Sequence, residues 1–466
     1  MSQKVPGGNR AATSHGAETS PGMGNDVGTR ALGLPKLAAM SAANHANTGS
    51  SRCCEGVHSM GSLTENVSTA RLSADSICLN RGNASVDGSP LVPPIAQSTT
   101  FQRSGVGSDP KHQYSRVSNP SVTTLEQTLG ALEDAPPAVC FGTGLAAETA
   151  LFLSILRAGD HVVCGRGVYG GTTRLLQQLL SDLDISTTFV DSTNLEEIRS
   201  SIRPNTELLF IETPANPTLA LTDIQACARI ASDHGVILAV DNTFLTPILQ
   251  RPLDHGADIS VYSTTKFIDG HSVALGGSLV SKHTQILERI RFIRKCTGAI
   301  QSPFNGWLTT NGVKTLPLRI RAQSASAELI AQRLSELSSI SRVFHPSLAE
   351  GNDAAIAQRQ HLDGHGAVVS FEIAGGYDAA CTFVESLQLC TLVEHVGSVE
   401  TLITHPASMT HADVPPAQRE SAGITDGLLR LSVGLEPTHE LLNDIEHALA
   451  LASQSPCPQT EEAVHA

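Results

Sequence analysis

The sequence of 466 residues lacks the features that mark membrane, secreted and nucleic-acid-binding proteins. No apolar run approaches the roughly 20 residues that a helix needs to cross a bilayer. The first thirty residues contain no continuous apolar stretch of the kind found in secretory signals. Basic residues are few, with 31 Lys and Arg against 45 Asp and Glu, and the formal net charge is −14. This charge argues against nucleic-acid and anionic-membrane partners.

The usual metal-binding and disulfide patterns are also missing. The ten cysteines include the adjacent pair Cys53 and Cys54 but no Cys-x-x-Cys, and the eighteen histidines include no His-Glu-x-x-His. We therefore expect neither a metal site nor a disulfide framework. The cysteine pattern favours a reducing, cytoplasmic location.

Composition divides the chain into segments. Residues 1–70 are rich in Ser, Thr, Gly, Ala and Asn, and no aromatic residue precedes Phe101. Such a segment buries too little apolar surface to offset its ordering entropy, so we predict a disordered extension. Residues 71–117 have no strong helical period, which predicts an extended arm in contact with a neighbouring subunit. An α/β domain at 118–317, an α+β domain at 318–453 and a disordered tail at 454–466 complete the expected organisation.

Short strands and helices alternate after the arm. This pattern predicts a mostly parallel sheet with helices on both faces and ligands at the carboxyl ends of its strands. The expected strands are 138–141, 161–164, 186–190, 208–211, 236–240 and 259–263, and the expected helices are 123–132, 145–156, 172–183 and 223–234. In the second region we expect helices at 319–337 and 441–451 and a strand at 367–371.

The last strand of the first region leads into Ser263, Thr265 and Lys266. Two hydroxyls beside one amine suit a phosphorylated aldehyde cofactor, because the hydroxyls can donate to phosphate and the amine can react with the aldehyde. Ser-x-Thr-Lys alone occurs more often as a polar surface loop. Residues upstream of it decide in favour of the cofactor site.

Four upstream loops each offer a cofactor contact. The turn from Phe141 to Ala147 is rich in glycine and opens a helix, so its N–H groups form an anion site. Tyr169 precedes two glycines and can stack on a ring or pack in the core. Asn216 lies in a polar loop after another strand. Asp241 ends a buried strand and needs a cationic partner, unless it caps a helix.

Two basic positions suggest anion binding. Arg430 interrupts an apolar strand, where a buried guanidinium needs an anion such as a substrate carboxylate; a salt bridge to Glu436 is the alternative. Tyr114 and Arg116 follow the arm and can reach a phosphate on another subunit, although an ordinary surface Arg is the commoner case.

Together these segments resemble the cysteine/methionine-metabolism family of pyridoxal-phosphate enzymes, which includes cystathionine γ-synthase, cystathionine γ-lyase, cystathionine β-lyase and the homoserine sulfhydrylases. The resemblance runs from Leu79 to Leu451. It rests on many motifs in one order: Tyr114-Ser115-Arg116, Gly144-Leu145-Ala146-Ala147, Tyr169-Gly170-Gly171-Thr172, Glu212-Thr213-Pro214, Asn216-Pro217, Val240-Asp241-Asn242-Thr243, Ser263-Thr264-Thr265-Lys266, Glu400-Thr401-Leu402-Ile403 with His405-Pro406, and Arg430-Leu431-Ser432-Val433-Gly434.

The resemblance implies a fold and a cofactor. The fold is type I of the PLP-dependent transferases (aspartate-aminotransferase-like), with a mostly parallel seven-stranded sheet domain and a smaller C-terminal α+β domain. The cofactor is pyridoxal 5'-phosphate. Lys266 would hold it covalently and move protons, Asp241 would pair with its ring nitrogen, and Tyr169 would stack on the ring and assist catalysis. The phosphate and ring contacts would come from Gly144, Leu145, Ser263, Thr265, Asn216 and Thr243.

The resemblance also implies partners and a reaction. Tyr114 and Arg116 would complete the phosphate site of a neighbouring subunit, in a homotetramer of two active dimers. Small amino-acid substrates would bind through Arg430. Arg174 and Glu394 match the residues that γ-specific members place near a substrate with a distal carboxylate. We therefore expect a cystathionine γ-synthase reaction on O-succinylhomoserine, with cystathionine γ-lyase or β-lyase as the alternative and a homoserine sulfhydrylase less favoured. His395 departs from the family, which usually has Ser or Asn there.

Overall fold

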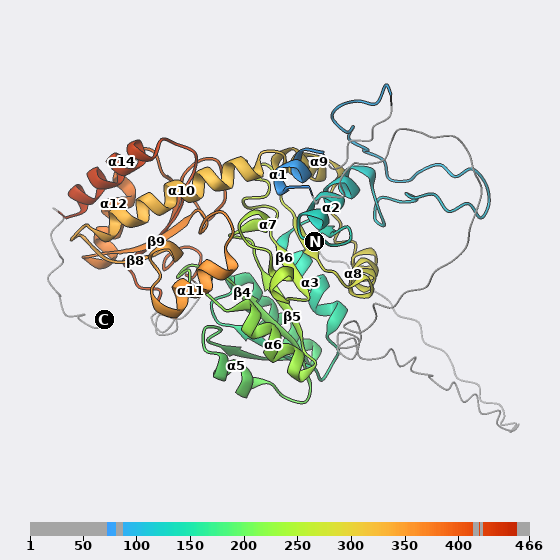
Figure 1. The fold of residues 1–466 in the computed structure, drawn as a ribbon, viewed down its shortest axis with the longest axis horizontal. Coiled ribbons are helices and arrows are strands. Elements are labelled where there is room, and N and C mark those ends of the chain that lie inside the picture. The colour runs from blue at the N-terminus through green and yellow to red at the C-terminus, as the bar shows by residue number, and fades with distance from the viewer. Residues whose placement is uncertain (1–71, 81–86, 413–418, 420–422, 454–466) are drawn as a thin grey trace, which may run out of the picture. The chain divides into compact units, whose positions relative to one another are not determined.

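Two β-sheets organise the described part of the chain (Figure 1). The computed structural model describes residues 72–80, 87–412, 419 and 423–453. The segments predicted to be disordered, 1–70 and 454–466, lie outside the described residues. The predicted domain boundaries at 117/118 and 317/318 also stay a prediction. In the described residues no helix has the length and apolar character needed to cross a membrane.

The first sheet has seven strands in the order β1-β7-β6-β5-β4-β2-β3. Strand β7 is antiparallel to both of its neighbours, and the other four pairings are parallel. The mostly parallel sheet is therefore confirmed. Its strands are β1 (Val139–Phe141), β2 (His161–Gly165), β3 (Ser186–Val190), β4 (Thr206–Glu212), β5 (Ile237–Asp241), β6 (Ile259–Tyr262) and β7 (Gly277–Val280).

Six of these strands were expected, within two residues at each end, but β7 was missed. It has only four residues and begins at a glycine, which is a poor strand former. Gly277 is required by close packing, since a Cβ there would lie 2.2 Å from the carbonyl oxygen of Thr143. The same contact brings the start of β7 against the loop that follows β1.

Helices cover the first sheet. They are α2 (Pro120–Leu132), α3 (Gly144–Ile155), α4 (Gly170–Arg174), α5 (Leu195–Ser201), α6 (Ile224–His234), α7 (Thr246–Leu249), α8 (Thr284–Thr297) and α9 (Pro303–Val313), with a short helical turn at Pro252–His255. The single helix predicted at 172–183 is instead α4 followed by a π-helical stretch, Leu175–Leu180, and a 3₁₀ turn, Ser181–Leu183.

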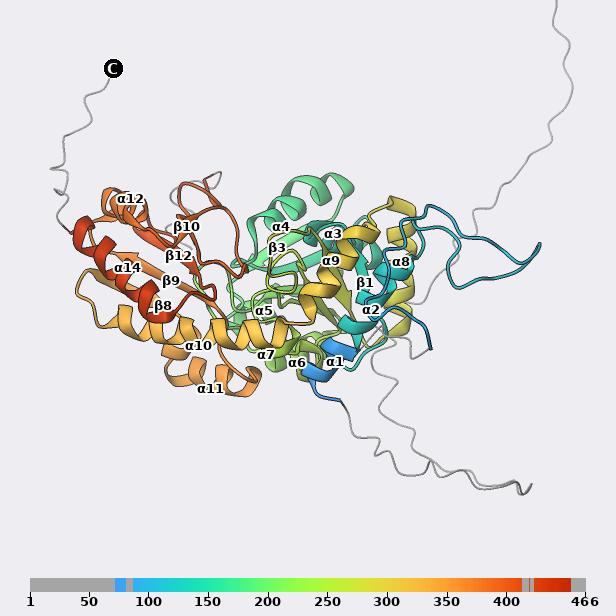
Figure 2. The same cartoon turned by 90° about the horizontal axis from the view of Figure 1, so that it is seen from above.

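The second sheet has five strands in the order β10-β11-β12-β9-β8. Helix α10 (Leu316–Ser335) extends from beside α7 to a position alongside β8 and β9 in both views (Figure 2). The other elements here are β8 (Ile340–Phe344), a turn at Pro346–Leu348, α11 (Gly351–Gln360), β9 (Val368–Ile373), α12 (Gly376–Ser386), β10 (Thr391–Leu392), β11 (Leu402–Thr404), β12 (Leu428–Ser432) and α14 (Thr438–Ala452).

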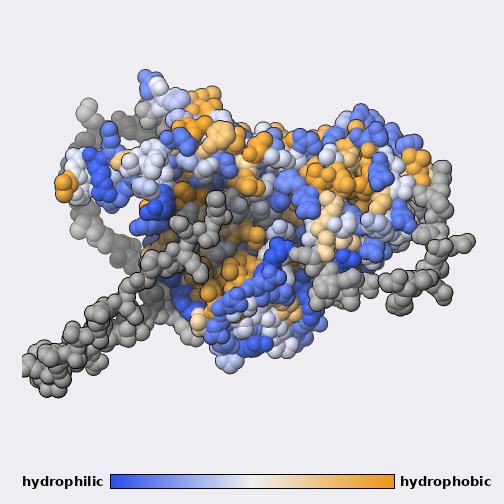
Figure 3. Space-filling model, turned by 180° about the vertical axis from the view of Figure 1, so that it is seen from behind, coloured by the Kyte–Doolittle hydropathy of each residue, from blue (hydrophilic) through white to orange (hydrophobic). Residues whose placement is uncertain are grey.

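The segment expected to be an extended arm is partly helical. Helix α1 (Ala74–Asn80) packs Ile77 and Cys78 into the main core, and Asp75 forms an ion pair with Arg321 at 2.7 Å. This part of the arm therefore lies on its own chain. Further along, apolar side chains of the arm remain exposed, among them Leu91 and Val106. Apolar residues also reach the surface among polar ones on the face seen in Figure 3.

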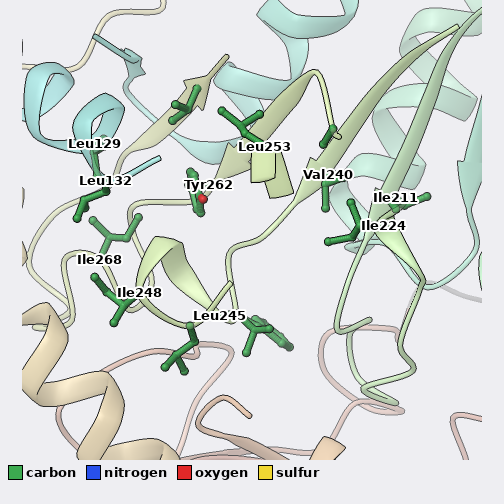
Figure 4. Close-up of a cluster of buried hydrophobic side chains, with 14 of the residues drawn as sticks. Leu129, Leu132, Ile211, Ile224, Val240, Leu245, Ile248, Leu253, Tyr262 and Ile268 are labelled. Atoms are coloured by element: carbon green, nitrogen blue, oxygen red, sulfur yellow. The ribbon is translucent and has the colours of Figure 1, made fainter. Parts of the chain in front are cut away.

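Successive side chains along the strands of the first sheet point to opposite faces and belong to two separate hydrophobic clusters. Val163, Leu209 and Val240 point into a cluster with residues of α2, α6 and α7 (Figure 4). Their neighbours Val162 and Leu208 point to the opposite face, into a cluster with residues of α3 and α8. A sheet covered on both faces explains the nearly continuous apolar strands in the sequence. The polar loops after those strands are therefore left at the sheet's edge.

A buried ion pair fixes β1 against α2 and α8. The carboxylate of Glu126 accepts from Arg294 at 2.5 Å and from the backbone N–H of Cys140 at 3.1 Å. Arg294 also donates to the carbonyl oxygens of Cys140 and Val117. Both side chains are less than a tenth exposed, so water cannot replace either partner.

We predict that Glu126→Gln lowers the free energy of unfolding by about 3–5 kcal/mol, because it leaves the Arg294 charge buried without a counter-charge. Denaturant unfolding monitored by circular dichroism measures the change. Arg166→Met is the matched control, since the Arg166–Glu197 pair is much more exposed and should matter little. If the two substitutions lower the free energy of unfolding equally, burial of the Glu126–Arg294 pair does not determine its contribution to stability.

Candidate active site

The carboxyl ends of neighbouring strands bring the predicted site residues together. In the sheet, β4, β5 and β6 are adjacent, and Glu212 at the end of β4 is the register partner of Asp241 at the end of β5. Asp241 is in turn the partner of Val261 in β6, which leads into Ser263. The edge at which a parallel sheet binds ligands therefore carries these polar residues, as the sequence predicts.

Asp241 is buried and held by Thr243. The backbone N–H of Thr243 donates to Asp241 Oδ1 at 2.8 Å, and Thr243 Oγ1 accepts from the backbone N–H of Ser263 at 2.8 Å. Burial raises the pKa of Asp241 to about 6, although the hydrogen bonds from Thr243 oppose the rise. The alternative that Asp241 caps a helix is wrong, because α7 begins at Thr246 with Leu245 as its N-cap. A cation beside Asp241 would stabilise its charge.

The start of α3 approaches Ser263 closely. A Cβ on Gly144 would lie 3.0 Å from Ser263 Cβ, so only glycine fits this approach without displacement. Thr143 caps the helix by accepting from the N–H of Ala146 at 3.0 Å. The N–H groups of Gly144 and Leu145 precede the first hydrogen bond of the helix and remain available to an anion. Thr265 is committed elsewhere, since its hydroxyl donates to the carbonyl oxygen of Gly276 at 3.0 Å.

Lys266 lies beside a histidine of the second sheet's region. The distance from Lys266 Nζ to His395 Nδ1 is 3.2 Å. Burial, and then the charge of Arg430, lower the pKa of Lys266 to about 8. Gly397 makes the approach possible, because a Cβ there would lie 2.5 Å from the backbone nitrogen of Phe267. The amine is therefore much closer to its neutral, nucleophilic form at pH 7 than an ordinary lysine.

Arg430, on β12, lies in the same group of residues. It donates to Asn216 Oδ1 at 2.8 Å and, at 3.1 Å each, to the carbonyl oxygen of His395 and to Thr404 Oγ1. The alternative of a salt bridge to Glu436 is wrong, because Glu436 accepts from Thr401 instead. Arg430 Nε is buried and has no hydrogen-bond partner within the described ranges. The structure thus holds a guanidinium with spare capacity for an anion.

Tyr169 opens α4 on the other side of this group. Its backbone N–H donates to Glu212 Oε2 at 2.7 Å, while its side chain is half exposed. The ring lies over Gly171, where a Cβ would approach Tyr169 Cε1 to 2.4 Å. The aromatic face is therefore available to a ligand rather than packed in the core.

Four residues of the predicted site are exposed, namely Tyr114, Arg116, Arg174 and Glu394. Arg116 lies 4.9 Å from the centre of the Tyr114 ring, so these two side chains contact each other. Arg174 ends α4, and Glu394 directly precedes His395; both are exposed.

Sequence reasoning did not assign a role to three residues that the structure brings into the site. Glu212 and Thr404 contact Tyr169 and Arg430, as described above. Glu148, on α3, is buried and accepts from Thr172 Oγ1 at 2.7 Å. A charged residue within the apolar stretch from Leu145 to Leu156 was a signal that could have identified Glu148.

Comparisons with known proteins agree with this geometry. The sequence profile of the family described as Cys/Met metabolism PLP-dependent enzyme matches residues 75–450. The cystathionine γ-lyase of Bacillus subtilis is 41% identical over 356 residues, which cover 76% of this chain and 93% of the relative. The cystathionine γ-lyase of Bos taurus is 41% identical over 365 residues, covering 78% and 89%.

Solved structures of similar proteins include both reaction types. The cystathionine γ-synthase of Xanthomonas oryzae pv. oryzae, in complex with aminoacrylate and cysteine, has a TM-score of 0.81 at 36% identity and covers 83% of this chain and all of that one. The cystathionine γ-lyase of Lactobacillus plantarum, complexed with L-serine, has a TM-score of 0.79 at 36% identity and covers 82% of this chain and all of that one. The fold inferred from sequence is therefore confirmed.

We predict that Lys266 of the cofactor-free protein reacts with a small aldehyde, under reductive trapping, at a rate that is half-maximal near pH 8. The rate should rise through this value because only the neutral amine attacks the aldehyde. Peptide mass spectrometry over a pH series measures the labelling, with the exposed Lys295 as an internal control. A half-maximum near pH 10.5, typical of lysine, would show that Lys266 is not perturbed.

Proposed function

The chain belongs to the family of Cys/Met metabolism PLP-dependent enzymes, and we propose that it catalyses γ-replacement. In this reaction the sulfur of cysteine displaces the acyloxy group of an O-acyl-homoserine, giving cystathionine and the free acid. O-Succinylhomoserine is the proposed acyl donor. The observation that carries the proposal is the joint position of Lys266, His395 and Arg430, which supplies an amine and a carboxylate-binding guanidinium in one buried group.

The residues fit pyridoxal phosphate by their chemistry. The close approach of Gly144 to Ser263 forms a cradle that a larger side chain would fill, with helix N–H groups for a phosphate. Asp241, whose buried carboxyl has no cationic partner among the residues that the structure describes, would hold the ring nitrogen in its protonated form. Tyr169 would lie against the ring, and Thr243 and Asn216 would complete its surroundings, while the hydroxyl of Thr265 stays bonded to Gly276. When bound, the cofactor supplies an electron sink for negative charge at the substrate's Cα and Cβ.

The protein's own groups would then bind and move protons. Arg430 would bind the α-carboxylate of the substrate through its unpaired Nε and the fork of donors beside it. Lys266, with its lowered pKa, would remove the proton at Cα and return it. Burial of Arg430 strengthens its interaction with a bound carboxylate, because water does not screen it.

Arg174 and Glu394 would determine which side chain is accepted. Arg174 ends the short helix that Tyr169 opens, so it lies near the residue assigned to the cofactor ring. A cation there suits the distal carboxylate of a succinyl ester, and Glu394 suits the ammonium group of an incoming amino acid. Tyr114 and Arg116 would act on a phosphate bound by a neighbouring subunit, in a homotetramer. The exposed apolar side chains of the arm support such an assembly.

A second candidate is cleavage of cystathionine by a lyase reaction. The names of the most similar relatives favour it, since they include the γ-lyases of Bacillus subtilis and Bos taurus and the β-lyases of Lactococcus lactis. Arg430 and Lys266 would have the same roles in either reaction. The two differ in whether cysteine enters at Cγ or whether a keto acid and ammonia leave.

We expect the purified protein to form cystathionine when it is given O-succinylhomoserine and cysteine. A panel of O-succinylhomoserine, O-acetylhomoserine, cystathionine and methionine, each with and without cysteine, separates the candidates by chromatography of the products. Lys266→Ala should abolish turnover and the visible absorbance of bound cofactor. If the protein releases a keto acid from cystathionine but forms no cystathionine, the proposal of γ-replacement is wrong and the lyase reaction takes its place.

We also predict that Arg174→Met raises KM for O-succinylhomoserine about 10- to 100-fold, the value of one charge-assisted hydrogen bond. The KM for O-acetylhomoserine, which has no distal carboxylate, serves as the control and should change little. Steady-state kinetics with both esters tests this difference. If both KM values change equally, Arg174 has a structural role instead.

A further inference from the structure

Glu148 makes a buried contact that the proposed reaction does not use. It lies on α3, one turn after the N–H groups assigned to phosphate, and its side chain is almost completely buried. Its Oε2 accepts from Thr172 Oγ1 at 2.7 Å, and Thr172 is also almost completely buried. This hydrogen bond joins α3 to α4, the two helices whose first turns carry the residues assigned to the cofactor's phosphate and ring.

The turn that carries Tyr169 is held at both ends by a carboxyl group. Glu212 accepts from the backbone N–H of Tyr169 at 2.7 Å, and Glu148 accepts from the hydroxyl of Thr172. Between them lies Gly171, over which the Tyr169 ring packs. The position of this turn therefore determines where the ring lies.

We infer that Glu148 is a positioning residue for the cofactor, which fixes the Tyr169 ring through its hydrogen bond to Thr172. The inference rests on the proposed function, because it assigns Tyr169 to the cofactor ring. A positioning residue of this kind must keep one geometry over the pH range in which the enzyme works.

The charges around Glu148 favour its neutral form. The titratable groups near it are Asp241 on β5, Glu212 on β4 and Cys164 on β2, none of which is a cation. Burial, and then the charge of Asp241, raise the pKa of Glu148 to about 8. Burial and Asp241 also raise the pKa of Glu212, which Arg430 opposes. With Glu148 protonated, Asp241 has one less negative neighbour and can keep the charge that the ring nitrogen needs.

The raised pKa gives stability a defined dependence on pH. Below about pH 4.5 Glu148 is protonated in both the folded and the unfolded chain. As the pH rises from about 4.5 to about 8, only the unfolded chain releases this proton, so folding becomes less favourable. Glutamine keeps the acceptor for Thr172 and does not titrate. We therefore expect Glu148→Gln to raise Tm of the holoprotein by an amount that is near zero at pH 4.5 and grows up to pH 8.

Binding of pyridoxal phosphate tests the contact itself. We expect Glu148→Ala and Thr172→Val each to raise the Kd for the cofactor about tenfold, the effect of one buried hydrogen bond. The double variant should bind no more weakly than the weaker single variant, because both remove one interaction. Glu148→Gln should stay within about threefold of the natural protein. Thr149→Val, which removes a hydroxyl from the same helix without touching Glu148, is the matched control.

The outcomes decide between this inference and a general loss of packing. Effects of Glu148→Ala and Thr172→Val that multiply in the double variant would overturn it, as would an unchanged Kd in both single variants. A Tm difference for Glu148→Gln that does not vary with pH would show that Glu148 is not the group that titrates. If the natural protein binds no pyridoxal phosphate at all, the proposed function fails, while the pH dependence of Tm still reports on Glu148.

Discussion

The burial of opposite charges in one small group is the constraint on which this structure depends. Asp241 and Glu212 end adjacent strands, and Lys266 and Arg430 lie close enough to perturb each other or the carboxyls. Burying an uncompensated charge is costly, so each of these groups must have a partner within the protein or in a ligand. Arg430 uses part of its hydrogen-bonding capacity on Asn216, Thr404 and the carbonyl oxygen of His395. Asp241 accepts one hydrogen bond from the backbone of Thr243. What they leave unsatisfied is what a cofactor and an amino acid would supply.

Close backbone packing sets the precision of the site. Gly144, Gly277 and Gly397 each lie where a Cβ would meet backbone or side-chain atoms within 3.0 Å. The loops after β1 and β6, the start of β7 and the segment after His395 are thereby held against one another. Closely packed segments of this kind cannot shift without displacing their neighbours. The fold, rather than the ligand, therefore sets the distances between Lys266, Ser263 and the start of α3.

Much of the fold was predictable, because strands buried on both faces appear in the sequence as short apolar runs, whereas the main helices are longer and mix apolar with polar residues. Strand β7 was not, since four residues beginning with Gly and Ser give no such signal. The site was predictable where a residue type is unusual for its place, as with Asp241 at a buried strand end or Arg430 inside an apolar strand. Contacts such as Lys266 with His395, or Glu148 with Thr172, join residues that are distant in the chain, and no local pattern reports them.

Thr404 and Arg430 of the second sheet and His395, in the loop between β10 and β11, are neighbours in space, and all three lie within residues 395–430. The guanidinium that we assign to the substrate's α-carboxylate thus lies in a later part of the chain than the residues assigned to the cofactor. A chimera joined within α10 would therefore exchange the group assigned to the α-carboxylate, while Arg174, assigned to the distal carboxylate, would stay with the cofactor residues.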